Sequence, residues 1–310
     1  MPVVFASLDP ASVIVTAAIA LVTTLATLRL RFKFEERLLR RRADTDYELL
    51  RRRADTEYEF ERRRQLRKQI GQYHGPLLSA VDAFSDRLEN LTRHHGCGWL
   101  DDARDEHGQW SDRYYFRSTV VRFMRLMALV FAFEREAIFV DASVAEPDDT
   151  RFLIYARTIR FAMTDVRLFA KTGYRRGEQT DHFFTDDLRQ MCSRLTAGGQ
   201  EIDLDRLDTM LRGEHRLDPV MAYFHGLTPR TLKWDRLFAL QTVLLAFMND
   251  FGHQVQHSSQ KELDRAIMQI NNPKVVANLR EWLPRIGCRT LGSSSSIFAA
   301  LNAHHQEPTT

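Results

Sequence analysis

The chain has 310 residues, of which 44% are hydrophobic and 27% charged. This composition is too apolar for a disordered chain, and 14 glycines and 9 prolines are too few for a fibrous repeat. The 44 basic and 41 acidic residues nearly cancel, which excludes a globally basic nucleic-acid-binding protein. Three cysteines, an odd number spaced far apart, exclude a disulfide scaffold and suit a reducing compartment.

The N-terminal part of the chain contains an uncharged run, ASVIVTAAIALVTTLATL, over residues 11–28. A helix of about 20 residues spans the hydrocarbon core of a bilayer, so the run predicts a transmembrane helix over 11–30. Residues 1–10 then form a short external N-terminus. A buried core helix is one alternative. A cleaved signal peptide is another, although residues 1–10 lack the Lys or Arg that such a peptide carries.

Basic residues follow this run directly, at Arg29, Arg31 and Lys33. Basic residues beside a membrane span stay on its cytoplasmic side. We therefore expect the N-terminus outside the cell, the bulk of the chain in the cytoplasm, and the protein in the inner (cytoplasmic) membrane. At this position the three side chains are also expected to contact anionic lipid headgroups.

An eleven-residue repeat follows the predicted span. Residues 40–50 read RRRADTDYELL, residues 51–60 read RRRADTEYEF, and arginines 62–64 begin a third copy. This period corresponds to about 3.67 residues per turn, which is typical of a straight or slightly right-handed helical bundle. The repeat therefore predicts a charged helical stalk, or coiled coil, over residues 31–71.

Two sets of side chains predict self-association. Within the predicted span, small residues recur every four positions and let two membrane helices approach closely; they are Thr16, Ala20 and Thr24. In the stalk, one helix face carries an apolar stripe formed by Ala43, Tyr47, Leu50, Ala54 and Tyr58. A parallel homo-oligomer buries this stripe. The alternative is a single solvated helix with ion pairs such as Arg40 with Asp44. Nucleic acid is not an expected partner, because acidic residues interrupt the arginines and no aromatic platform accompanies them.

We expect an all-α cytoplasmic domain over residues 72–290, because Gly75-Pro76 should break the stalk helix. No stretch alternates polar and apolar residues for long enough to build a sheet. The domain is therefore predicted to be an irregular helical bundle, followed by a polar, partly disordered tail at 291–310. Its helices are expected at 77–94, 114–140, 147–170, 183–196, 203–212, 216–225, 234–257 and 273–283.

No catalytic motif is present: the chain lacks a phosphate loop, a dinucleotide fingerprint, a nucleophile elbow and an HExxH sequence. We therefore assign no catalytic residue and predict no cofactor, although an enzyme is not excluded. Asp250, His253 and His257 have the spacing of metal ligands on one helix face. The alternative for these three is a polar helix end that faces water.

Charged residues also interrupt the most apolar helices. Arg125, Arg160 and Arg167 are candidates for a pocket that binds an anionic ligand. The alternative is a structural network in which these arginines pair with Glu134 and Asp165 inside the bundle.

Three segments carry a resemblance: YHGPLLSAVDAFSDRLENL from Tyr73, YYFRSTVVRFMRLMALVFAFEREAIFVD from Tyr114, and YRRGEQ at 174–179. With their Gly-Pro-Leu-Leu, Phe-Glu-Arg-Glu and Arg-Gly-Glu-Gln elements, residues 73–195 resemble a broad group of uncharacterised bacterial membrane-anchored helical proteins. The resemblance implies a helical fold and a bacterial origin, and it transfers no functional residue.

Together these features predict a single-pass, self-associating scaffold, adaptor or sensor that presents a cytoplasmic domain to an unidentified protein partner. The alternative is a membrane-anchored effector or enzyme with a ligand or metal pocket in the helical domain. Ligand binding by the domain would favour the alternative, whereas loss of function on scrambling the stalk would favour the scaffold.

Overall fold

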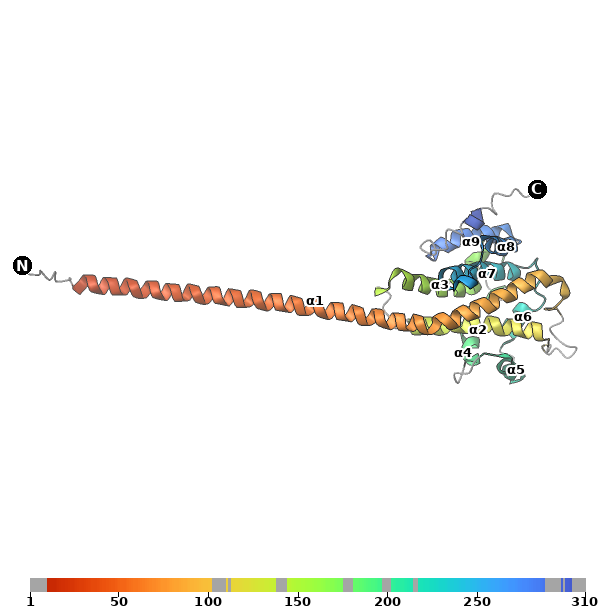
Figure 1. Cartoon of the computed structure of the whole chain (residues 1–310), viewed down its shortest axis with the longest axis horizontal. Helices are drawn as coiled ribbons and strands as arrows, with labels where there is room; N and C mark the ends of the chain where they lie inside the picture. Colours follow the sequence, from red (N-terminus) through yellow and green to blue (C-terminus); the bar gives the residue numbers. More distant parts are fainter. Residues whose placement is uncertain are drawn as a thin grey trace, which may run out of the picture. The chain divides into compact units, whose positions relative to one another are not determined.

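The computed structural model describes residues 10–101, 110, 113–137, 144–174, 181–196, 202–213, 217–287, 297 and 299–302, without the side chains of 10–13, 16, 17 and 211–213. Every element in this part of the chain is a helix, which confirms the predicted all-α class (Figure 1). The chain divides into two compact units, Met1–Glu61 and Arg62–Thr310.

The helices follow the predicted order for most of the chain. They are α1 (Pro10–His94), η1 (His95–Cys97), α2 (Tyr114–Ala137), α3 (Pro147–Thr164), η3 (Val166–Phe169), α4 (Thr185–Leu195), α5 (Leu204–Gly213), α6 (Asp218–Phe224), α7 (Leu232–Phe251), η6 (Gln254–Gln256), α8 (Gln260–Met268) and α9 (Pro273–Arg285).

α1 continues through Pro76, so the predicted helix break at Gly75-Pro76 is wrong. A proline inside a helix removes one backbone hydrogen bond and costs about 3 kcal/mol. The next helical turns bury several apolar side chains completely, among them Leu77, Val81 and Phe84. Each of these contributes about 1.5–3 kcal/mol, which offsets the proline. The second unit begins at Arg62, before the boundary expected near residue 72.

In the first unit every described side chain is exposed, from Ile14 to Glu61. No helix among the described residues is both long enough and apolar enough to cross a membrane, so the span predicted over 11–30 is not supported there. Residues 11–13, 16 and 17 of that span, including Thr16, lie outside the described side chains. Arg40 pairs with Glu36 at 2.6 Å, one turn back, and not with Asp44 as predicted.

The second unit has one hydrophobic core, with α7 at its centre. Every side chain from Trp234 to Met248 is buried. α7 packs against α3, α8 and α9, while α2 packs against α3, α4, α5 and α6. Within this unit, α8 and α9 therefore lie on one side of the α3–α7 pair, and α4 and α5 lie on the far side of α2 (Figure 1). The C-terminal part of α1 joins the same core, where the Phe84 and Phe123 rings are 5.7 Å apart.

Two helices end earlier than predicted. α3 stops at Thr164 and not near residue 170, because Asp165 has extended backbone angles (φ −85°, ψ 120°) and its carboxylate accepts a hydrogen bond from the Arg167 amide, which starts η3. α7 stops at Phe251 and not at 257, because Gly252 is also extended (φ −76°, ψ 165°).

Two features near the C-terminus differ from the sequence prediction. The helix α8 was not predicted, although Ser259 and Glu262 form a capping box at its start. In the predicted polar tail, Ile297, Ala300 and Leu301 are buried in the core, so the prediction is wrong for these residues. The rest of 291–310, apart from residues 299 and 302, lies outside the described residues.

Candidate functional site

The three predicted metal ligands lie on different elements. Asp250 is on α7 and accepts a hydrogen bond from the Tyr155 hydroxyl at 3.0 Å. His253 and His257 flank η6, and Nε2 of His257 lies 3.1 Å from the Gly252 carbonyl oxygen. Because α7 ends at Phe251, Asp250, His253 and His257 do not share one helix face. Within the described residues no group of three His, Cys, Asp or Glu side chains is placed to hold a metal ion.

Two of the three arginines, Arg160 and Arg167, pair with the expected carboxylates. Arg160 donates from Nε to both Glu134 oxygens, at 2.9 and 2.7 Å. Arg167 pairs with Asp165 at 2.5 Å. Burial raises the pKa of Asp165, but hydrogen bonds from the Arg167 side chain and amide outweigh this and hold it below its ordinary value. Both arginines therefore have structural partners.

Arg125, Arg160 and Arg167 do not share a pocket. Arg125 lines a hollow beside Arg122, whereas Arg160 lines a separate cavity between α2, α3 and α4. We call this second cavity the arginine pocket. Its volume is 550 Å³. Its apolar floor is formed by Ala128, Phe131, Ala132, Phe133 and Leu153, and its basic residues are Arg135, Arg157, Arg160 and Arg189.

Three of the four basic residues of the arginine pocket, Arg157, Arg160 and Arg189, lie against aromatic rings. The guanidinium carbon of Arg157 is 4.9 Å from the Phe161 ring centre, and that of Arg189 is 5.5 Å from the Phe131 ring centre. Cys192 also lines the pocket and is buried. Burial raises the pKa of this thiol, so it stays protonated at neutral pH and is a poor nucleophile.

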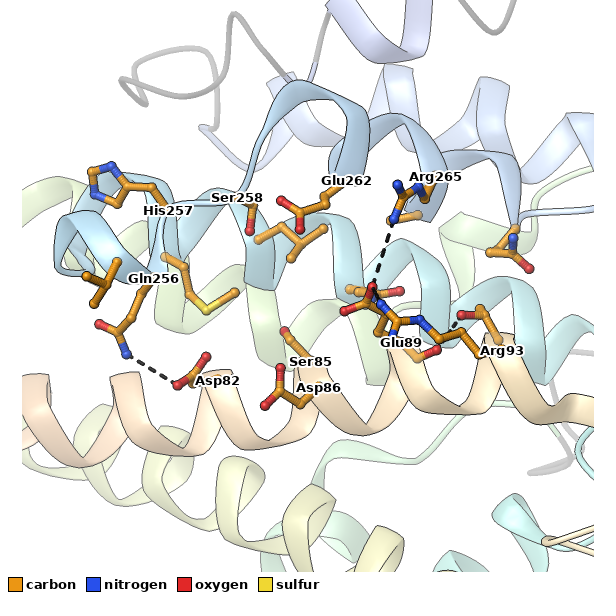
Figure 2. Close-up of a pocket in the computed structure, with 17 residues that line it drawn as sticks. Asp82, Ser85, Asp86, Glu89, Arg93, Gln256, His257, Ser258, Glu262 and Arg265 are labelled. Atoms are coloured by element: carbon orange, nitrogen blue, oxygen red, sulfur yellow. Dashed lines mark hydrogen bonds and ion pairs between the residues drawn. The ribbon is translucent and has the colours of Figure 1, made fainter.

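A second cavity, which we call the acidic cleft, has a volume of 280 Å³ and lies between α1, α7 and the η6–α8 segment (Figure 2). Its acidic residues are Asp82, Asp86 and Glu89 on α1 and Glu262 on α8. At one end Glu89 binds both Arg93, at 2.5 Å, and Arg265, at 3.9 Å. At the other end Asp82 accepts a hydrogen bond from Gln256 at 3.4 Å.

Between these two ends lie Ser85 and Asp86 (Figure 2). The Ser85 side chain is buried, and its hydroxyl has no hydrogen-bond partner among the described residues. Burial and the neighbouring negative charges of Asp82 and Glu89 raise the pKa of Asp86, while Arg122 opposes the shift. The cleft thus contains a hydroxyl and a neighbouring carboxylate for which the described residues form no hydrogen bond and no ion pair, respectively, although Arg122 acts on the carboxylate electrostatically.

Sequence analysis missed most of the residues in both cavities. It identified Arg160 and Glu134 of the arginine pocket and His257 of the acidic cleft. Asp82, Asp86 and Glu89 follow one another at steps of four and three residues, which places them on one helix face. That spacing was a usable signal. The opposite wall comes from residues 255–269, which no local pattern links to α1.

No protein-family model, no curated protein and no solved structure matches this chain. The resemblance of residues 73–195 to bacterial membrane-anchored proteins therefore gains no support from these comparisons. Function has to be argued from the geometry of the two units.

Proposed function

We propose that the chain is a single-pass membrane protein whose helical stalk self-associates and presents the second unit to a protein partner. One observation supports both halves of this proposal: the apolar side chains described in the first unit are exposed, whereas most of those described in the second unit form a core. Exposed apolar surface in water costs about 25 cal/mol per Å². The proposal assigns a lipid bilayer to one part of this surface and a second copy of the chain to the other.

The membrane half of the proposal concerns residues 11–30. The sequence carries no charge over 11–28, and the structure leaves Leu21, Val22 and Leu25 between 54% and 64% exposed. The basic residues Arg29, Arg31 and Lys33 come next in the sequence. We assign them to the cytoplasmic headgroup region of the inner membrane, with the N-terminus outside.

The self-association half concerns the stalk stripe of Ala43, Tyr47, Leu50, Ala54 and Tyr58. At about 3.67 residues per turn, a residue eleven positions away returns to the same face, so Phe32 lies on the face of Ala43. Phe32 is 76% exposed and Leu50 is 64% exposed. A second copy of this helix offers a matching stripe in the same register. We therefore propose a parallel homo-oligomer.

Membrane extraction tests the first half. The full chain should remain in the membrane pellet after alkaline carbonate treatment. Leu21→Arg should shift it toward the supernatant, because a charged residue at the centre of a span costs about 2.5–3.5 kcal/mol. Leu49→Arg, outside both the span and the stalk stripe, is the matched control. Release of the wild-type chain by carbonate would refute the anchor.

Native mass spectrometry of the full chain in mild detergent tests the second half. A defined oligomer is expected. Leu50→Glu should dissociate it, whereas Leu49→Glu should not, because Leu49 is the adjacent residue and lies off the stripe. A monomeric wild-type chain at micromolar concentration, or equal effects of the two substitutions, would refute association through this stripe.

The arginine pocket favours a second candidate function, in which the domain binds an anion with an apolar tail. Its volume of 550 Å³ lies within the range of about 300–1,000 Å³ for small-molecule sites. It also joins an apolar floor to four arginines and a single glutamate. The same mass spectra test this function: wild-type protomers should carry an added anionic mass that Arg157→Gln removes, and bare protomers would contradict it.

A further inference from the structure

We propose that the acidic cleft binds a small organic dication of the alkyl diamine class, with Ser85 and Asp86 as its central contacts. This inference does not depend on the membrane anchor, the oligomer or the arginine pocket. It rests on an unpaired buried hydroxyl, on the distribution of charge in the cleft and on the size of the cavity.

Ser85 differs from most other helical hydroxyls in this protein. The hydroxyl of Thr92, which lines the same cleft, donates to the Glu89 carbonyl at 2.6 Å. Thr158 and Thr242 likewise donate to carbonyls one turn back, at 2.7 and 2.9 Å. Ser85 is 4% exposed and makes no such bond. Figure 2 shows its side chain extending from α1 into the cleft, toward the wall that carries Glu262.

A buried hydroxyl without a partner carries a cost similar to that of a lost hydrogen bond. A hydroxyl oxygen has two lone pairs and accepts hydrogen bonds from an ammonium group, which has three N–H donors. An ammonium between Ser85 and Asp86 would therefore satisfy the hydroxyl and neutralise the carboxylate together.

The charges of the cleft specify the ligand further. Four carboxylates line it against two guanidinium groups, and both of these, Arg93 and Arg265, lie at Glu89. Asp82, Asp86 and Glu262 have no basic side chain as a described ion-pair partner. Glu262 instead accepts a hydrogen bond from the Ser259 amide at 2.7 Å. Because acidic groups lie on two walls of one cavity, two positive charges suit it better than one.

The size of the cleft selects a small molecule. Its volume of 280 Å³ falls just below the range of about 300–1,000 Å³ for drug-sized ligands, so only a smaller molecule fits it. A divalent metal is a poorer candidate, because no three His, Cys, Asp or Glu side chains among the described residues are placed to coordinate one. A short diamine matches both the volume and the charge.

Isothermal titration of the full chain with 1,4-diaminobutane tests the proposal. Saturable binding to one site per chain is expected, and 1,4-butanediol, which has the same length without charge, should not bind. Asp86→Asn should weaken binding by about tenfold or more, because a charge-assisted hydrogen bond is lost. Asp187→Asn is the matched control, since Asp187 is an exposed residue of α4 outside the cleft.

Ser85→Ala separates binding from folding. The variant should bind the diamine more weakly and melt no lower than the wild type, because the hydroxyl it removes has no hydrogen-bond partner in the part of the chain that the structure describes. Absence of saturable diamine binding would overturn the proposal. So would equal weakening by Asp86→Asn and Asp187→Asn, which would indicate attraction by the general surface charge, or unchanged diamine affinity in Ser85→Ala.

Discussion

The two parts of α1 have similar secondary structure and opposite environments. Before Glu61 its described large apolar residues are all exposed, and most of them, such as Leu25 and Leu50, are more than half exposed. After Arg62 the same types of residue, such as Leu77 and Leu88, are fully buried. The backbone hydrogen bonds of a helix form within the helix itself, whereas burial of its side chains needs neighbouring elements. In the described structure only the second unit supplies such neighbours, and for the first we propose a bilayer and a second copy of the chain.

Substitution of two phenylalanines on α1 tests this comparison, and one of them gives the largest expected loss of stability. Phe84 is fully buried against Phe123, whereas Phe34 is 65% exposed. Phe84→Ala should lower the free energy of unfolding by about 3–5 kcal/mol, because it leaves a cavity in the core. Phe34→Ala should change it by less than about 0.5 kcal/mol. Urea unfolding of the full chain, followed by tryptophan fluorescence, measures both, and equal losses would contradict the division.

The next largest effect is a pH dependence of stability, which a buried carboxyl group in the second unit should cause. Burial raises the pKa of Asp235 from 3.8 to about 6, although hydrogen bonds from Asn271 and Asn272 oppose the shift. The folded state then holds a proton that the unfolded state has released. The stability of the wild type should therefore fall as pH rises from 4 to 6 and level off above that range, by a total of about 2–3 kcal/mol.

Asp235→Asn tests the pH effect, because an amide oxygen can still accept the hydrogen bond from the Asn271 amide, now 2.7 Å long. The variant should lose most of the fall in stability between pH 4 and 6. Asp187→Asn should keep it. Parallel pH profiles for the wild type and Asp235→Asn would assign the pH dependence to other groups.

Neutralising one partner of an ion pair should give the smallest change in the free energy of unfolding. This change should again differ between the two units. Arg160 and Glu134 are 15% and 22% exposed, whereas Arg40 and Glu36 are 76% and 57% exposed. Glu134→Gln should lower the free energy of unfolding by about 1–2 kcal/mol, and Glu36→Gln by less than about 0.5 kcal/mol. The same urea titrations measure both. A larger loss for Glu36→Gln would show that the stalk is stabilised by more than local pairs.

Much of the fold could be predicted from the sequence, because apolar periodicity determines which face of a helix is buried. This holds for α2 and α4. The ion pair between Glu134 and Arg160 was also among the pairs that the sequence predicts. The break at Pro76 was predicted wrongly because a local rule was applied where tertiary packing dominates. The start of α8 carried a readable signal in Ser259 and Glu262, which the sequence analysis did not use.

The candidate sites were less predictable, because their walls come from distant parts of the chain. The acidic cleft joins Asp82 and Ser85 to residues more than 170 positions later, such as Glu262. The metal hypothesis failed on backbone geometry: it required Asp250 and His257 to share a helix that ends at Phe251. Such long-range pairings depend on how helices pack, and side-chain spacing alone does not encode them.

The burial of Cys192 in α4 makes its thiol a reporter of local unfolding in the domain. Its protonated, enclosed thiol reacts with a water-soluble maleimide only when the segment opens, whereas the exposed Cys97 reacts at once. In a chain with Cys97 and Cys288 replaced by serine, the labelling rate of Cys192 therefore counts opening events of α4. Any ligand that occupies the arginine pocket beside Cys192 should lower this labelling rate.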